Sequence, residues 1–342
     1  MLIRPPPHSQ FPIITVFENR IEKQGTTVSA SIRSFRNTDI PELCRLWNTR
    51  LHPLGEFEPM TPQQMEVVAL GKPYFVPDQL LVAEAPAGEL VGFLHAGPLS
   101  NDSMSDWDVD RCGIFALYAT GSDAEEVLRA MLLTALDSAL TQASVVYLQP
   151  PLPQAAYYLG FGPGDAMAGT DNSALPVDAV AQQVGFEVQE QWMHWELSLA
   201  TFHPPIDRMQ LMVRRSAEVQ RGFDEPQLPW WLACVFGHAD LLQYRLLAHS
   251  DQRCLGDALL WALPLELPQA QGRIWMFPLT ATETSEAQAA QTFLLAEAFR
   301  DLQNQRVDTI CTACRADDAA VIGVLDRLGF VCEFQGNVLV KR

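Results

Sequence analysis

The chain has 342 residues, of which 48% are hydrophobic and 19% are charged, and its formal net charge is −18. This length suggests two or three domains, and the composition is that of an ordinary globular protein. No apolar run reaches the roughly 20 residues of a membrane span, and residues 1–28 lack the apolar core of a secretory signal, so we expect a cytoplasmic protein without a membrane partner. The negative charge repels polyanions, which argues against nucleic acid; it either favours amine-bearing ligands or only keeps the protein soluble.

The seven cysteines are an odd number and are scattered along the chain, so they predict no disulfide framework. Cys311 and Cys314 have the spacing of a metal-binding pair. However, no second pair follows, and a strand at this position places the two thiols on opposite faces. We therefore predict no metal site.

The first half of the chain predicts one alternating order of strands and helices. After residues 1–28, a leader to which the sequence assigns no role, we expect a strand at 29–35, a helix from Ile40 capped by Thr38 or Asp39, and a shorter helix from a Thr61 capping box with Gln64. A hairpin (79–85 and 89–95), a strand (111–119), an amphipathic helix (123–142) and a buried strand (144–148) follow. A closing helix and strand occupy 177–199.

The second half predicts the same order. After a linker at 201–208, we expect a strand at 209–214, a helical region at 229–247 broken at Gly237-His238, and a strand pair within 253–265. A strand (273–279), a long helix (284–302), a buried strand (307–314) and a closing helix and strand (319–340) complete it. Gly185-Phe186 and Gly329-Phe330 end the two closing helices, where a left-handed glycine is expected. We predict two homologous domains, 29–200 and 209–342.

This order resembles the GCN5-related N-acetyltransferase (GNAT) family. The resemblance is carried by IRSFRNTDIPELCRLWN (32–48), LLVAEAPAGELVGFLHAG (80–97), LRAMLLTALDSA (128–139) and the two Gly-Phe closures. It implies an α/β fold with two tandem acyl-CoA N-acyltransferase domains, each a mixed central sheet flanked by helices, similar in layout to mycothiol synthase. It also implies acetyl-CoA as cofactor, with its pantetheine arm on the fourth strand and its pyrophosphate at the start of the next helix.

The glycine-rich turn that holds the pyrophosphate in this family is degenerate in both halves. In the first half the aligned positions hold Ala124, Glu125, Val127 and Arg129, and a predicted Ser122–Glu125 capping box and three acidic residues oppose an anion. We expect this cofactor site to be lost.

The second half keeps small residues at the turn, although Ser285 and Gln288 predict another capping box. The resemblance therefore places a weakened cofactor site here. Its predicted residues are Phe277, Leu279, Ala287, Ala289 and Ala290.

Catalytic residues are not evident. The tyrosine that often serves the family as general acid is replaced by Ala181 and Leu325. Candidate bases are Glu84, Asp257 and Glu266, although each is also readable as a solvated or capping carboxylate. Tyr118 is either a catalytic residue near the acyl group or a packed strand residue. Tyr157, Tyr158 and Phe161 form either a substrate loop or a segment that covers the core.

Two functions remain open from the sequence. One is an acetyl-CoA-dependent N-acyltransferase that acts on a small amine, with its cofactor in the C-terminal domain. The other is a non-catalytic ligand-binding or protein-interaction module that has lost acetyl-CoA binding. Either protein would be a monomer or a homodimer.

Overall fold

The computed structural model describes residues 30–51, 59–137, 143–161, 177–222, 226–264, 272–280 and 284–342. The predicted leader and Glu266 lie outside the described residues. The chain divides into two compact units. Unit 1 comprises Met1–Gln189, Leu228–Gly237 and Asn337–Arg342, and unit 2 comprises Glu190–Gln227 and His238–Gly336.

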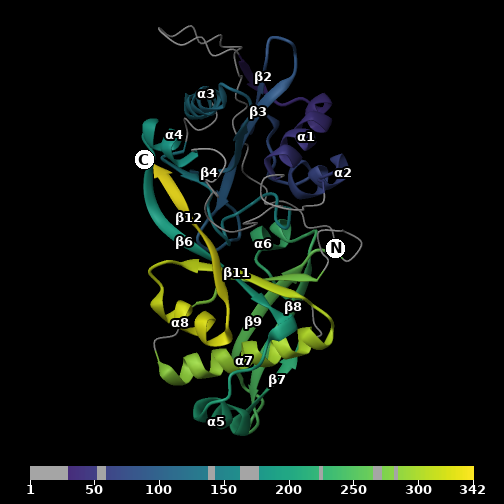
Figure 1. The fold of residues 1–342 in the computed structure, drawn as a ribbon, viewed down its shortest axis with the longest axis vertical. Helices are drawn as coiled ribbons and strands as arrows, with labels where there is room; N and C mark the ends of the chain where they lie inside the picture. Colours follow the sequence, from purple (N-terminus) through teal and green to yellow (C-terminus); the bar gives the residue numbers. More distant parts are fainter. Residues whose placement is uncertain are drawn as a thin grey trace. The chain divides into compact units, whose positions relative to one another are not determined.

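Unit 1 is built on a mixed sheet with the order β1-β2-β3-β4-β5 followed by the end of β12 (Figure 1). The strands are β1 (Ser31–Ser34), β2 (Leu80–Glu84), β3 (Leu90–Ser100), β4 (Trp107–Ala119), β5 (Val145–Leu148) and β12 (Val331–Lys341). All neighbours are antiparallel except β4 and β5, which are parallel.

Unit 2 repeats this pattern with the order β7-β8-β9-β10-β11-β6. Its strands are β6 (Glu187–Ser198), β7 (Ala217–Arg221), β8 (Asp240–Ala248), β9 (Cys254–Ala262), β10 (Arg273–Met276) and β11 (Thr309–Arg315). Again only one pair, β10 and β11, is parallel. The predicted α/β class, with mixed sheets and flanking helices, is therefore confirmed.

Part of the closing strand of each half belongs to the unit built mainly from the other half. β5 pairs with β12, where Leu148 lies opposite Leu339, and β11 pairs with β6, where Thr312 lies opposite Trp195. The last residues of the chain thus complete unit 1, and residues 190–198 complete unit 2. The sequence order did not reveal this exchange, because a strand's pattern shows that it is buried but not which strand it joins.

Helices cover both faces of the unit 1 sheet. α3 (Ala124–Asp137) and α4 (Val177–Gln183) pack on the face that carries Leu94 and Ala96. Because neighbouring strand residues point to opposite faces, Phe93 and His95 face the other side. That side carries α1 (Ile40–Leu51), α2 (Pro62–Met65) and a π-helical turn (Glu66–Leu70).

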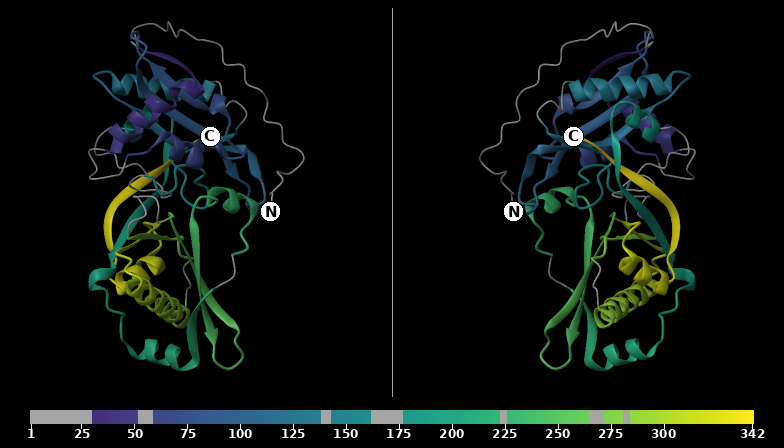
Figure 2. Two further views of the ribbon diagram at one scale, coloured as in Figure 1. Left: turned by 90° about the vertical axis from the view of Figure 1, so that its right-hand side faces the viewer. Right: turned by 90° about the vertical axis from the view of Figure 1, so that its left-hand side faces the viewer.

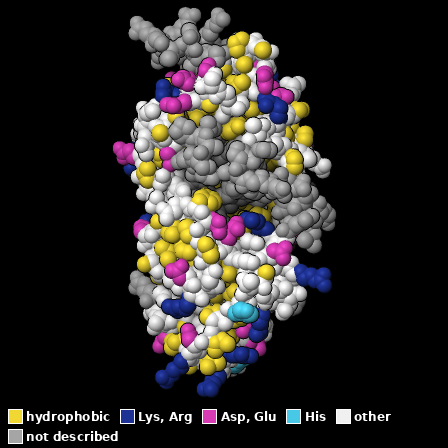
Figure 3. Space-filling view, in the orientation of Figure 1, with side chains coloured by type: hydrophobic (Ala, Val, Ile, Leu, Met, Phe, Trp, Pro, Cys, Tyr) yellow, Lys and Arg dark blue, Asp and Glu magenta, His cyan; other side chains and the backbone are white. Residues whose placement is uncertain are grey.

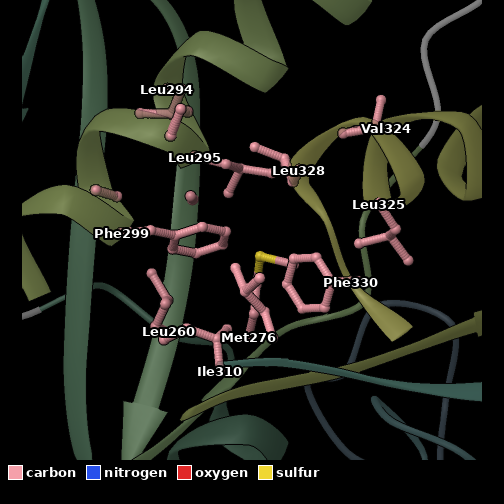
Figure 4. Packing of buried hydrophobic residues seen from close by; sticks show 14 of the residues in the cluster. Leu260, Met276, Leu294, Leu295, Phe299, Ile310, Val324, Leu325, Leu328 and Phe330 are labelled. Carbon is pink, nitrogen blue, oxygen red and sulfur yellow. The ribbon is translucent and has the colours of Figure 1, made fainter. Parts of the chain in front are cut away.

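In unit 2, α5 (Arg208–Ser216), α7 (Ser285–Asn304) and α8 (Ala319–Leu328) accompany the sheet. α7 lies along one face of β8 and β9, as Figure 2 shows. Side chains of α7, α8 and the strands interdigitate in the core, including Met276, Phe299 and Phe330 (Figure 4). The short helix α6 (Trp230–Val235) lies between β7 and β8 in the sequence but belongs to unit 1.

The two glycine turns have the predicted geometry. Gly185 and Gly329 have φ values of 93° and 86°, and the Phe330 amide donates to the Leu325 carbonyl as a helix C-cap requires. The Thr61 capping box is also present, since Thr61 accepts from the Gln64 amide.

Two element predictions in the second half are wrong. Residues 209–214 lie in α5 rather than in a strand: Asp207 caps the helix by accepting from the Gln210 amide, and Met209 and Val213 share a face at helical spacing. Residues 240–247 lie in β8 rather than in a helix, because pairing with β7 and β9 outweighs the helix propensity of its leucines. Accordingly the strand pair is β8 with β9, not a hairpin within 253–265.

Candidate cofactor and substrate sites

In unit 2 the parallel strands part at the place where a cofactor arm is expected. β11 pairs with β6 over its whole length, Thr309–Arg315, whereas β10 pairs with β11 only from Arg273 to Trp275. The backbone that follows, residues 276–280, includes Phe277 and Leu279, both half-buried. On this segment Thr312 Oγ1 donates to the Met276 carbonyl (3.2 Å).

Gln291, in the second turn of α7, borders the same segment. Its Nε2 donates to the Thr280 carbonyl (3.3 Å), while its Oε1 is buried and has no hydrogen-bond partner among the described residues. A buried acceptor left unsatisfied costs roughly 1–3 kcal/mol unless a donor reaches it. The sequence pattern does not single out Gln291, because the direction of its side chain depends on the packing of α7.

The first turn of α7 differs from the predicted capping box. The cap is Thr284 rather than Ser285, since Thr284 Oγ1 accepts from the Ala287 amide (3.3 Å). Ala287 lies in this first turn and is half-buried. Ala289 faces the core, and Ala290 packs against it. Of the three alanines assigned to the cofactor, only Ala287 therefore lies in the first turn.

In unit 1 the strands also part, after Ile114 and Leu148. The register of β3 and β4 shifts here: Ala96 pairs with Ile114 and His95 pairs with Ala116, so Phe115 is an extra residue, a β-bulge.

The start of α3 in unit 1 is acidic, with Glu125 and Glu126 in its first turn. Ser122 donates to the Asp123 carboxylate (2.8 Å), and Glu125 accepts from Arg129 (3.2 Å) rather than taking part in the predicted box. This end of α3 therefore presents carboxylates to an approaching anion.

The predicted substrate loop of unit 1 is in the interior. The Tyr158 ring stacks on Trp47 with centroids 4.5 Å apart, and its hydroxyl lies 2.7 Å from His95 Nδ1. Tyr157 packs on His95 at 4.2 Å, and Phe161 accepts from the Trp47 indole through its carbonyl (2.9 Å). These aromatic side chains fill the face of β3 and β4 that is opposite α3.

His95 is fully buried within this aromatic cluster. Burial lowers its pKa to about 3, so the imidazole is neutral. Its Nε2 has no hydrogen-bond partner among the described residues.

The candidate acids and bases do not converge. Glu84 accepts from Arg33 (2.6 Å), which also binds Asp39. Asp257 is exposed on β9, with Gln243 Nε2 at 3.5 Å. Tyr118 is buried on β4 against Phe93, with ring centroids 6.3 Å apart.

Within the described ranges, no group of three or more His, Cys, Asp or Glu side chains is arranged to hold a metal. In the same ranges no helix is long and apolar enough to cross a membrane.

Comparisons with protein-family models and with curated protein sequences return no match. Solved structures do match. A fungal GCN5-related glucosamine N-acetyltransferase region within a multi-domain β-N-acetylglucosaminidase aligns with a TM-score of 0.62 at 12% identity, covering 91% of this chain and 38% of that one. This chain therefore spans well under half of that protein.

Two further structures match over almost their whole length. A tandem GNAT protein from the clavulanic acid biosynthesis pathway aligns with a TM-score of 0.59 at 12% identity, covering 91% of this chain and 98% of its own. A GCN5-related N-acetyltransferase from Sphaerobacter thermophilus gives 0.55 at 12% identity, with 92% and 96% covered. Together with the repeated strand order of the two units, these alignments establish that the chain is a tandem protein of the GNAT fold.

Proposed function

We propose that the protein is an acyl-CoA-dependent N-acyltransferase for a small amine-bearing substrate, with its cofactor in unit 2. The observation that carries this proposal is the segment 276–280, where β10 has left β11. Beside it lies the buried Oε1 of Gln291, which has no hydrogen-bond partner among the described residues. An amide N–H of a pantetheine arm is a donor of the kind that this oxygen lacks.

Unit 1 supports the same division of roles. Its sheet face is filled by Tyr157 and Tyr158, and its α3 begins with carboxylates. Both features disfavour an acyl-CoA in unit 1, so we assign it a structural role. Acetyl-CoA is the simplest cofactor to test.

The reaction requires little from the protein beyond positioning. The ammonium first loses a proton to water, and the free amine nitrogen then attacks the thioester carbonyl carbon. The C–N bond forms and the C–S bond breaks, the nitrogen gives its second proton to water, and the leaving thiolate takes a proton. Ala181 and Leu325, at the positions of the family's usual acid, cannot supply that proton, so we expect water to supply it. The acidic charge of the protein favours a cationic amine at the site.

A non-catalytic ligand-binding module remains the second candidate. It is favoured by Glu286, a negative charge in the first turn of α7, and by the Thr284 cap, which already occupies one amide of that turn. Both features weaken a pyrophosphate site.

Isothermal titration with acetyl-CoA separates the two. The blocking variant is Ala287→Glu, which adds charge in the first turn of α7; Ala289 is unsuitable because it faces the core. Ser122→Glu adds the same charge beside α3 and is the matched control. We expect micromolar binding that Ala287→Glu abolishes and Ser122→Glu leaves unchanged. No heat at millimolar acetyl-CoA would reject the acyltransferase in favour of the module.

A further inference from the structure

The segment around α5 exposes apolar side chains. Of the nine large hydrophobic residues that are exposed in the described part of the chain, three fall within residues 206–212: Ile206 is 85% exposed, Leu211 48% and Met212 54%. The other six lie singly in the sequence. Scattered exposed apolar residues are normal in soluble proteins, whereas a local group of them often marks a binding surface.

The same helix carries unpaired positive charge. Arg208, Arg214 and Arg215 are exposed, and within the described residues none of them forms an ion pair. Figure 3 shows several Lys and Arg side chains at the bottom of the view, in the region where Figure 1 labels α5. The nine residues of α5 therefore carry a local positive charge, whereas the whole chain has a net charge of −18.

The exposed face of α5 has an ordered pattern. Arg208, Leu211, Met212 and Arg215 stand at i, i+3, i+4 and i+7, so they form one stripe with apolar residues in the middle and a charge at each end. The other side of the helix is held by its own unit, where Gln210 Nε2 donates to the Ala289 carbonyl of α7 (3.1 Å). The stripe therefore faces away from α7.

This pattern is that of one half of a helix pair. In paired helices an apolar seam is flanked by charges that select a partner of opposite charge. The two arginines are about 10 Å apart along the helix axis, from a rise of about 1.5 Å per residue, and the complementary arrangement is Glu, Leu, Leu and Glu at the same spacing on a second helix. Met212 adds an adaptable apolar contact.

We propose that α5 docks an acidic amphipathic helix of a partner protein. A polypeptide fits better than nucleic acid or an anionic bilayer, because the acidic remainder of the protein repels an extended polyanionic surface. A short acidic helix, by contrast, lies within a Debye length of about 8 Å of the α5 stripe. Phosphate backbones also leave Leu211 and Met212 without apolar partners. The stripe defines the binding site as Arg208, Leu211, Met212 and Arg215.

Fluorescence anisotropy with the full-length protein tests the site. The probe is a fluorescein-labelled peptide of about 20 residues, long enough to form a helix, with Glu, Leu, Leu and Glu at i, i+3, i+4 and i+7. The charge variant is Arg208→Glu with Arg215→Glu, and the apolar variant is Leu211→Ser with Met212→Ser. The matched control, Arg306→Glu with Arg327→Glu, makes the same charge change at two other exposed arginines.

We expect saturable binding that weakens at least about tenfold in both site variants, changes less than about twofold in the control, and is lost when the peptide carries Lys in place of Glu. Circular dichroism verifies that every variant is folded. Binding unaffected by the site variants, or no binding at millimolar peptide, overturns the proposal. The proposal is also overturned if the wild type does not bind the peptide but binds phosphatidylserine vesicles or duplex DNA, and the site variants abolish that binding.

Discussion

The hydroxyl of Tyr158 lies 2.7 Å from Nδ1 of His95 in the interior of unit 1. Tyr158 adopts a left-handed backbone, with φ of 63°, to make this contact. Such a conformation costs a residue with a side chain about 1–3 kcal/mol, and the stacking of its ring on Trp47 and its hydrogen bond offset that cost. A segment that the sequence offered as a substrate loop is thereby a packed part of the core.

The buried imidazole predicts a pH-dependent stability. Burial lowers the pKa of His95 to about 3 in the folded state, whereas the pKa of the unfolded state is about 6.5. As pH falls below about 6.5, the imidazole therefore takes up a proton in the unfolded state but stays neutral in the folded state. The contribution of His95 to the unfolding free energy is therefore fully present above the unfolded pKa and is lost progressively below it. Between pH 7 and pH 5 we expect His95 to remove about 2 kcal/mol of unfolding free energy.

Urea denaturation of the wild type and His95→Gln at the two pH values measures this loss. The variant should show a smaller decline by about 2 kcal/mol, and Tyr158→Phe, which keeps the imidazole, should decline like the wild type. Equal declines in all three proteins would show that His95 does not titrate in this range.

Gln291 links stability to cofactor binding. Gln291→Met removes, at similar volume, the buried Oε1 that has no hydrogen-bond partner in the described part of the chain. We expect the unliganded protein to lose less than about 1 kcal/mol of unfolding free energy, because this removal offsets the lost bond to Thr280. Acetyl-CoA affinity should fall about tenfold, the worth of one hydrogen bond. Thermal unfolding with and without acetyl-CoA measures both effects. A variant that binds as tightly as the wild type shows that Oε1 meets no ligand donor.

Glu84 is a candidate base that the structure places in an ion pair. Burial raises the pKa of its neighbour Asp39, but hydrogen bonds from Arg33 and the Arg36 amide outweigh this, and the net pKa is lowered. Because Arg33 also holds Glu84 at 2.6 Å, Glu84→Gln should keep acyl transfer within about twofold and cost less than about 1 kcal/mol of stability. Initial rates over pH 6–9 check this, with Asp257→Asn as the counterpart in unit 2. A loss of activity above about a hundredfold would make Glu84 the base.

Lys72 fastens α6 to the rest of unit 1. Its Nζ donates to the carbonyls of Cys234 and Val235 (2.9 Å each) at the end of α6, and burial lowers its pKa to about 8. Lys72→Met leaves these carbonyls short of a donor and should cost about 1–3 kcal/mol, while Lys72→Arg should cost less.

Because the folded pKa of Lys72 is below the unfolded value near 10.5, the wild type gains stability as pH rises between these values. The advantage of the wild type over Lys72→Met should therefore increase from pH 8 to pH 10. Denaturation curves measure it, and hydrogen exchange over residues 230–237 reports whether α6 is loosened. Unchanged exchange in Lys72→Met would contradict the fastening role.

The sequence by itself determined the repeat and the class of fold. The two Gly-Phe turns, the Thr61 capping box, the hairpin of β2 and β3 and the long helix α7 were predictable because each depends on local backbone geometry or on an apolar period within one element. The same patterns failed at α5 and β8, where short apolar runs fit both periods and strand pairing decides the outcome.

Only the tertiary structure decided which strands pair and which side chains meet. The exchange of β6 and β12 between the units, the burial of Tyr157 and Tyr158 around His95, and the position of Gln291 beside residues 276–280 all join segments far apart in the chain. The sequence period of a helix or strand determines the face on which each residue lies, but the partners of that residue depend on which other elements pack against that face. For this reason the fold was readable from the sequence, whereas the site was not.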